Sequence, residues 1–230
     1  MKFKIVLCCI SLVFLWSCNG DKIVISGEIV HCNSSYLPLM QILPDEIVVI
    51  DTVLLLNGKF SHRIKSKEVG VYLLQVEDNV FLSFIADLGD KLIFSGDAAN
   101  LQNTYDIQGN EETKLLVDTR RKLEQVYQQT KPLSNDFVRY TENSQLDSIQ
   151  KIDSLYNVLF ETHKTYLTNI IRSNPDKLAS LMAFYQKLGV NAFFSIEQDK
   201  ELLKIMYPAL SKKYPNSIYI KDLQEKLEEE

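Results

Sequence analysis

Cysteine and histidine are the side chains of this sequence best suited to redox, nucleophilic or metal chemistry, and they are few. The cysteines are Cys8, Cys9, Cys18 and Cys32, and the histidines are His31, His62 and His163. No two histidines have the spacing of a helical metal-binding pair, and the chain contains no CxxC. Neighbours on a strand point to opposite faces, so His31 and Cys32 do not form a catalytic pair. We therefore predict no catalytic residue, no metal site and no cofactor.

The motifs of the large enzyme classes do not occur either. The sequence contains no GxSxG, P-loop, GxGxxG or HExxH motif. Several carboxylates fall where turns are expected, namely Asp45, Glu46, Asp51, Glu77 and Asp78. The aromatic residues Tyr72, Phe81, Phe84 and Phe94 alternate with other apolar residues on expected strands, which favours a core position over a ligand groove. The expectation is a protein that is not an enzyme.

Lipid attachment at Cys18 is the one covalent chemistry that the sequence favours. Lys2 and Lys4 precede the apolar run Ile5 to Trp16, which is too short to cross a bilayer as a packed helix. Leu15 lies three residues before Cys18 and the small Ser17 directly before it, an arrangement that resembles the bacterial lipobox. Residues 1–17 are then a lipoprotein signal peptide, and Cys18 carries the lipid. A plain secretory signal or an uncleaved anchor remains the alternative.

Removal of residues 1–17 changes the net charge and the cysteine content of the mature chain. The removed segment carries two lysines and no acid, so the net charge changes from −5 to −7. The remaining lysines are scattered along an acidic sequence, a pattern that does not favour nucleic acid or anionic lipid as partner. Membrane contact is expected through the acyl chains instead. Cys32 is the single cysteine left over, and it cannot close an intrachain disulfide.

The segment 18–109 reads as a β domain. Short alternating stretches rich in β-branched residues predict eight strands at Ile23–His31, Leu37–Leu43, Ile47–Leu56, Lys59–Ile64, Gly70–Val76, Val80–Ala86, Leu92–Ser95 and Tyr105–Gln108. Asn57-Gly58 predicts a type I′ turn, and hence a hairpin between the third and fourth strands. The spacing favours an antiparallel β-sandwich or an open barrel.

The segment 110–230 reads as a helical region, so the fold class is α+β. A first helix is expected from about Leu115 and is interrupted at Pro132, and a heptad seam from Ile149 to Ile170 predicts a helix of about 25 residues. Asn174-Pro175 is expected to open the next helix, which ends at Gly189. Two further helices are expected. The first is capped by Ser195 and ended or kinked by Pro208, and the last begins at Asn216-Ser217.

These motifs together resemble a known family. The similarity rests on the lipobox, Gly27-Glu28-Ile29, Ile50-Asp51-Thr52-Val53, Asn57-Gly58-Lys59-Phe60, Gly70-Val71-Tyr72-Leu73, Gly89-Asp90-Lys91-Leu92, Gly96-Asp97, the junction Gly109-Asn110 and the ending Tyr214-Pro215-Asn216-Ser217. This pattern is similar to the domain of unknown function 4369, the N-terminal module of lipid-anchored thiol-disulfide oxidoreductases of the thioredoxin-like superfamily.

The resemblance implies a role in anchoring and partner binding. In such relatives the redox chemistry belongs to a CxxC in a following thioredoxin domain, which this sequence lacks, so no catalytic residue is carried over. The expected partners are the membrane, through the lipid, and a thioredoxin-like domain or another envelope protein. Cys18 is not followed by the aspartate that retains lipoproteins at the inner membrane, which favours the outer membrane, facing the periplasm. The alternative is a free-standing envelope lipoprotein that binds a glycan, peptide or small ligand on the sandwich.

Overall fold

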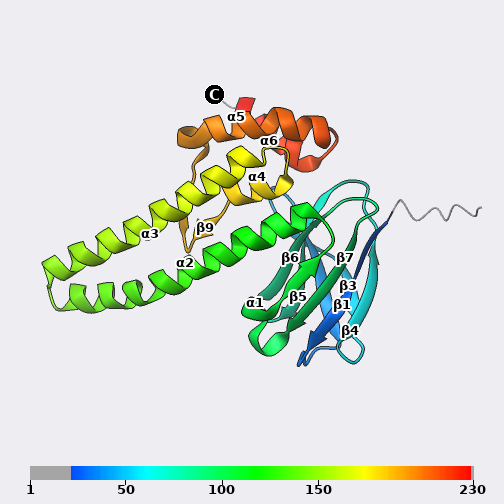
Figure 1. Ribbon diagram of the computed structural model, residues 1–230, viewed down its shortest axis with the longest axis horizontal. Helices are drawn as coiled ribbons and strands as arrows, with labels where there is room; N and C mark the ends of the chain where they lie inside the picture. The colour runs from blue at the N-terminus through cyan, green and yellow to red at the C-terminus, as the bar shows by residue number, and fades with distance from the viewer. Residues whose placement is uncertain (1–21, 229–230) are drawn as a thin grey trace, which may run out of the picture.

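The computed structural model describes residues 22–228 as a β-sandwich followed by a group of helices (Figure 1). The α+β fold class is therefore confirmed. Each predicted strand is present, with small shifts at the ends: β1 (Ile23–Val30), β2 (Tyr36–Ile42), β3 (Ile47–Leu54), β4 (Lys59–Ile64), β5 (Gly70–Glu77), β6 (Val80–Ala86), β7 (Lys91–Asp97) and β8 (Asp106–Gln108). Two short helical turns lie between β7 and β8, η1 (Ala98–Asn100) and α1 (Leu101–Thr104).

The strands form two four-stranded sheets, in the orders β4-β1-β7-β8 and β3-β2-β5-β6. All neighbours are antiparallel except β1 and β7, which run parallel from the Val24–Lys91 pair to the Val30–Asp97 pair. A parallel pair needs a long crossover, and here the crossover contains the whole second sheet together with β4. This topology is a sandwich with one parallel pairing.

The predicted hairpin between β3 and β4 is wrong, although its turn is right. Asn57 and Gly58 have the positive φ angles of a type I′ turn, 52° and 78°, and Leu56 and Lys59 exchange both backbone hydrogen bonds. Beyond that bridge the strands separate, because β3 pairs with β2 and β4 pairs with β1. The turn forms a corner between the sheets, and the local sequence contains no signal for the more distant partners.

The helical region contains five helices of at least seven residues and one small hairpin. Its elements are α2 (Glu111–Glu142), α3 (Leu146–Ser173), α4 (Leu178–Phe184), β9 (Lys187–Leu188), β10 (Asn191–Ala192), α5 (Ile196–Lys213) and α6 (Ile218–Glu228). The change from strands to helices occurs at Gly109-Asn110, where Asn110 caps α2 by accepting a hydrogen bond from the Thr113 N–H at 2.7 Å.

The first turn of α2 covers the free edge of β6. The Thr113 hydroxyl donates to the Ile85 carbonyl at 2.6 Å and accepts from the Ile85 N–H at 3.0 Å. The Asn110 amide donates to the same carbonyl at 2.9 Å. An uncovered edge strand is a template for unwanted pairing, so this contact both protects the sheet and fixes the start of the helix.

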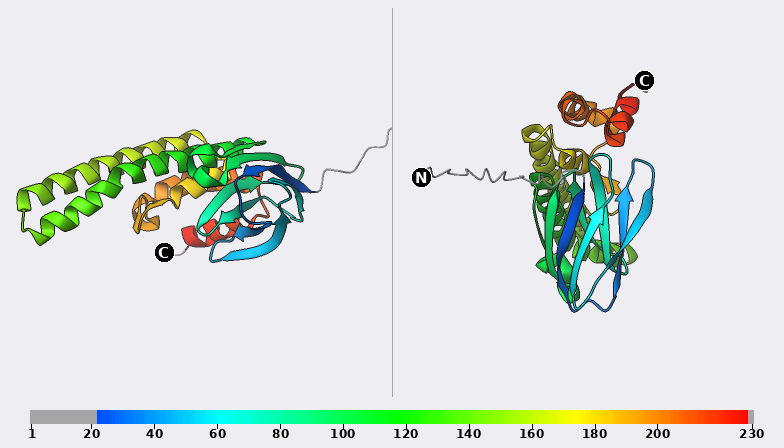
Figure 2. Two further views of the ribbon diagram at one scale, coloured as in Figure 1. Left: turned by 90° about the horizontal axis from the view of Figure 1, so that it is seen from below. Right: turned by 90° about the vertical axis from the view of Figure 1, so that its right-hand side faces the viewer.

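Helices α2 and α3 form an antiparallel hairpin, here called the arm, that projects away from the sandwich (Figures 1 and 2). The heptad seam is confirmed as α3, whereas the predicted interruption at Pro132 is wrong, because α2 continues to Glu142. Pro132 lies exposed on the helix, where water can solvate the carbonyl that loses its intrahelical partner. Packing against α3 outweighs the local helix-breaking preference.

Three further helix boundaries differ from the sequence prediction. Asn174 ends α3 by donating its side-chain amide to the Ile170 carbonyl, and α4 begins four residues later at Leu178. Gly189 has a φ of 61° in the turn between β9 and β10, so it belongs to a hairpin and does not end a helix. Pro208 lies inside α5, which continues to Lys213. The Ser195 cap is confirmed, since its hydroxyl accepts from the Gln198 N–H.

Candidate interaction surfaces

The predicted lipid site, Cys18, and the signal segment 1–17 lie outside the described residues. Cys32 lies in the loop after β1, where its thiol is half-buried beside the sandwich core. The sulfur lies 3.6 Å from the Val76 carbonyl oxygen and 3.8 Å from that of Ser34. This environment is that of a small side chain packed at the edge of a core.

The three histidines are far apart and have different partners. His31 Nδ1 lies 2.9 Å from Asp97 Oδ1 at one end of the sandwich, and His62 Nε2 lies 3.1 Å from Asp51 Oδ2 at the β3–β4 corner. The Thr52 N–H, together with the nearby His62 ring, holds the pKa of Asp51 below its ordinary value. Between residues 22 and 228, no group of three or more His, Cys, Asp or Glu side chains is placed to hold a metal ion.

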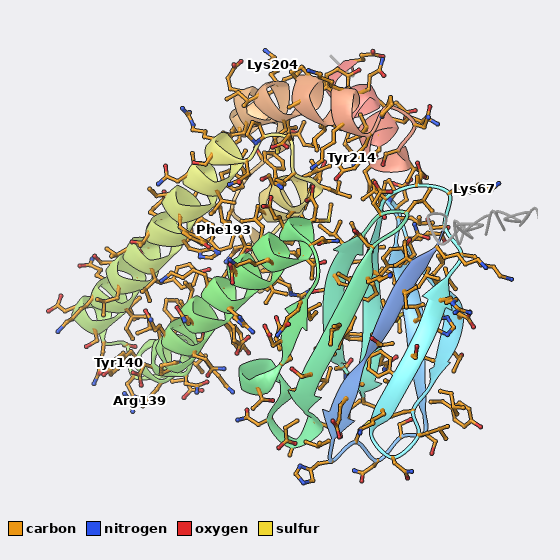
Figure 3. The ribbon with its side chains drawn as sticks, turned by 45° about the vertical axis from the view of Figure 1, so that its right-hand side comes forward. Lys67, Arg139, Tyr140, Phe193, Lys204 and Tyr214 are labelled. Atoms are coloured by element: carbon orange, nitrogen blue, oxygen red, sulfur yellow. The ribbon has the colours of Figure 1, made fainter. Side chains whose placement is uncertain are left out.

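His163 is buried where α3 meets the small β9–β10 hairpin. Its Nε2 lies 3.2 Å from the Gln186 side-chain oxygen, and its ring packs 4.7 Å from that of Phe193. Figure 3 shows Phe193 between the base of the arm and the helices that follow it. Burial lowers the pKa of His163, so the ring is neutral at pH 7. The ring therefore has a packing role between α3 and the segment that contains the β9–β10 hairpin.

Three of the four aromatic residues that were expected in the sandwich core lie there. Tyr72, Phe84 and Phe94 are buried and packed in sequence, with ring centroids 5.3 Å and 5.1 Å apart. Phe81 is only partly buried and lines a small surface cavity of about 120 Å³ beside Arg120 and Arg121. The expected core packing is therefore correct for the first three.

A buried carboxylate that the sequence analysis missed joins three helices. Glu112, in the first turn of α2, accepts hydrogen bonds from the Ala179 N–H at 3.0 Å, Lys213 Nζ at 2.9 Å and the Tyr214 hydroxyl at 2.9 Å. Burial, with the Glu112 carboxylate beside it, raises the pKa of Tyr214 well above its ordinary value. Figure 3 shows Tyr214 between α5 and the sandwich. Because its polar partners are satisfied, we assign this cluster the structural role of fixing α4 and α5 on α2.

The distal half of the arm exposes apolar side chains. Leu146 is 70% exposed at the turn between the helices, and Val138 is 57% exposed. Phe137, Leu155 and Val158 are exposed on the same half. Tyr140 and Arg139 lie at the tip in Figure 3, with the guanidinium 4.8 Å from the ring centroid. Exposed apolar residues gathered on a projecting element mark an interaction surface.

A groove lies midway along the arm, on the side where the β9–β10 hairpin leans against it. Its volume is about 470 Å³, and Tyr127, Tyr156 and the hairpin turn line it. The Asn191 amide donates to the Tyr156 hydroxyl at 2.8 Å, which attaches the turn to α3. Val190 at that turn is 92% exposed. The groove extends the apolar arm surface toward the body.

A second apolar surface lies on the outer face of β2 and β3. Tyr36 pairs with Leu54 across the two strands, and Met40 pairs with Val49. Tyr36 is 61% exposed, Val49 is 66% exposed, and Ile47 and Leu54 are also exposed. In the right panel of Figure 2, these light-blue strands lie on the side of the sandwich away from the arm. This surface is here called the bare sheet face.

A basic cluster forms at the beginning of the first sheet, from residues that are distant in sequence. Arg63 of β4 and Lys91 of β7 are the two cross-strand partners of Val24 in β1. Lys22 and Lys65 directly adjoin the Ile23–Ile64 pair at the same end. All four side chains are exposed, and none forms an ion pair with another described residue. These four residues are here called the basic patch.

Comparisons with known proteins add no relative. No family model matches the sequence, no curated protein is similar to it, and no solved structure resembles the fold at a significant level. None of the helices between residues 22 and 228 combines the length and the hydropathy that a bilayer crossing requires.

Proposed function

We propose that this chain is a noncatalytic module of the bacterial envelope that is lipid-anchored at Cys18 and binds a protein partner through its arm. The resemblance of its motifs to the domain of unknown function 4369 favours a thioredoxin-like thiol-disulfide oxidoreductase as the partner, with another envelope protein as the alternative. The outer membrane, with the module facing the periplasm, is the proposed location.

The arm is the observation that carries this proposal. Helix α3 has 28 residues and is therefore about 42 Å long. The distal half of the arm lies away from the sandwich and leaves Leu146 of α3 and Val138 and Phe137 of α2 exposed, an arrangement that contributes little to the stability of the sandwich. A partner that covers these side chains would remove their apolar surface from water.

The start of β1 and the tip of the arm lie at opposite ends of the molecule, which suits such a role. In Figure 1 the start of β1 lies at the right-hand end of the molecule and the tip of the arm at the left-hand end, and the left panel of Figure 2 shows the same separation. An anchor before residue 22 would hold the sandwich at the membrane. The tip of the arm would then face away from the bilayer, toward soluble partners.

Crosslinking in the intact envelope tests the arm. A photoreactive residue in place of Leu146 should crosslink to a protein that contains a CxxC, identified by mass spectrometry. The same residue in place of Lys212, exposed on α5, is the control and should not. When Phe137→Ser and Val138→Ser are added to the variant that carries the photoreactive residue in place of Leu146, the crosslink should disappear while the protein remains folded. Equal crosslinking at both positions would argue against an arm-bound partner.

Lipid labelling tests the anchor independently. Cells fed a palmitate analogue should label the wild-type protein and Cys32→Ala, whereas Cys18→Ala should carry no label. Label that persists in Cys18→Ala would place the acyl chain elsewhere and contradict the proposed anchor.

The bare sheet face favours a second candidate function, the binding of an envelope glycan, peptide or small ligand. A tyrosine beside exposed aliphatic residues is a typical surface for such ligands, and Tyr36 lies next to Leu54 in this way. A ligand that binds there should raise the melting temperature of the wild-type protein. The same ligand should leave the melting temperature of Tyr36→Ala unchanged. Absence of any shift over a panel of envelope glycans and peptides would count against this function.

A further inference from the structure

We propose that the basic patch lies against the anionic phospholipid headgroups of the leaflet that holds the lipid anchor. This inference rests on the proposed anchoring at Cys18, and it adds an orientation of the sandwich on the membrane. It also revises the expectation, drawn from the scattered lysines, that anionic lipid is not a partner. The lysines are scattered in the sequence but gathered by the strand register.

The patch contrasts with the rest of an acidic molecule. Four positive charges, from Lys22, Arg63, Lys65 and Lys91, surround the exposed end of one sheet in a chain whose net charge is −5. Lys67 follows in the next loop and lies at this same end of the sandwich (Figure 3). Basic residues close to a membrane surface are attracted by its anionic lipids.

The acids of this end face the other sheet. Asp45 and Glu46 belong to the loop between β2 and β3, in the second sheet. Asp90 precedes Lys91, but its Oδ2 accepts from the Asp87 N–H at 2.8 Å and from the Asn110 amide at 2.5 Å, so the carboxylate turns toward the start of α2. At this end the basic side chains therefore lie apart from these three carboxylates, which favours a membrane-facing orientation of the beginning of the first sheet.

The length of chain before the patch limits the distance to the lipid. Three residues, 19–21, separate Cys18 from Lys22. Even fully extended, this connection spans only about 14 Å. Lys22 is itself a member of the patch, so an anchor at Cys18 holds all four basic residues within reach of the headgroups. Ile93 is exposed two residues after Lys91 on the same outer face and adds an apolar contact.

Lysine footprinting of the acylated protein on vesicles tests this orientation. The full mature protein is inserted into vesicles of phosphatidylcholine, or of phosphatidylcholine and phosphatidylglycerol in equal parts, and acetylated briefly. Lys22, Lys65 and Lys91 should react about tenfold more slowly on the anionic vesicles. Lys131 and Lys151, exposed on the arm, should react equally on both. High salt should remove the difference, because it screens exposed charges.

Charge reversal provides a matched comparison. In Arg63→Glu combined with Lys65→Glu, the protection of Lys22 and Lys91 should be lost. Lys131→Glu combined with Lys151→Glu makes the same change in net charge, but on the arm. This variant should keep the protection of Lys22 and Lys91. Peptide mass analysis reports the acyl chains on Cys18 in each sample. An unacylated Cys18 would overturn both the anchor and this inference, whereas an acylated protein with equal labelling on both vesicles would overturn this inference alone.

Discussion

Tyr219 and Val71 are joined by a hydrogen bond that connects the last helix to the end of the second sheet. The Val71 N–H donates to the Tyr219 hydroxyl at 3.0 Å, and that hydroxyl donates to the Ile42 carbonyl at 2.6 Å. Tyr219 thus supplies hydrogen-bond partners to both backbone groups at the last residue pair of β2 and β5, where the two strands separate. The α6 helix, 148 residues further along the chain, is fixed to the sandwich by this one side chain and its apolar neighbours.

Removal of the hydroxyl in Tyr219→Phe should destabilise the protein by about 1–3 kcal/mol, because two buried backbone groups lose their partner. Urea unfolding monitored by circular dichroism would measure this as a lower midpoint at unchanged slope. Tyr36→Phe removes an exposed hydroxyl and should stay within about 0.5 kcal/mol of wild type. Equal effects of the two variants would contradict the role assigned to Tyr219.

The stability of the protein should decrease in mild acid because of His163. Burial lowers the pKa of this ring below its ordinary value of 6.5, so the unfolded chain takes up the proton first as the pH falls. The stabilisation is fully present above about pH 6.5 and is lost below it. His163→Gln should lose less stability than wild type between about pH 7.5 and about pH 5.5. Leu146→Ala, which changes no titratable group, should keep the wild-type dependence over this range.

The arm should be rigid at its base and tolerant at its tip. Leu167 is fully buried where α3 meets the following helices, so Leu167→Ala should cost about 2–5 kcal/mol. Leu146→Ala, in the same helix, should change stability by less than about 0.5 kcal/mol. Thermal and urea unfolding of the two variants would measure these two losses of stability. A large loss for Leu146→Ala would mean that the tip is needed for folding.

Pro132→Ala should stabilise the protein by about 1–3 kcal/mol, since alanine restores an intrahelical hydrogen bond within α2. Hydrogen exchange of the α2 amides, together with the urea midpoint, would show where the gain arises. Pro38→Ala changes a partly buried proline of β2, opposite Thr52 of β3, and serves to control for general effects of removing proline. An unchanged urea midpoint for Pro132→Ala would mean that the substitution lowers the free energy of the unfolded chain as much as that of the folded protein.

The purified mature protein should not reduce insulin in the presence of a thiol reductant. The described part of the chain offers one thiol, Cys32, which is half-buried at the edge of the core and has no neighbouring cysteine, so the rate should not exceed that of the reductant alone. Cys32→Ala should therefore behave like wild type in a turbidity assay with thioredoxin as the positive control. Insulin reduction that persists in Cys32→Ala would contradict the proposal that the module is noncatalytic.

Local pattern predicted the elements better than it predicted their partners. The eight strands could be located because alternation and turn residues are encoded within each stretch. The parallel pairing of β1 with β7 could not, since it depends on residues 67 positions apart that have no shared local signal. Pro132 and Gly189 were misread for the same reason. Packing against α3 and against β10 decides their conformation.

The surfaces depended even more on long-range structure. The heptad seam predicts α3. The apolar tip of the arm also depends on α2, which continues past Pro132 to Glu142, contrary to its local sequence. Arg63 and Lys91 meet Lys22 only through the register of β1 with its two neighbours. Glu112 could have been suspected from its place next to a helix cap, although its three partners come from residues 179, 213 and 214. The lipid site at Cys18 remains a prediction from sequence.

The central position of β1 in its sheet has a mechanical consequence. β1 is the first described strand, and it is paired along its length on both sides, with β4 over Ile23–Glu28 and with β7 over Val24–Val30. Hydrogen bonds between strands lie across the strand direction. A pull on residue 22 along β1 therefore loads both ladders in shear, so that many bonds must break together. Tension on the N-terminal end therefore meets the sandwich at a strand that is held from both sides.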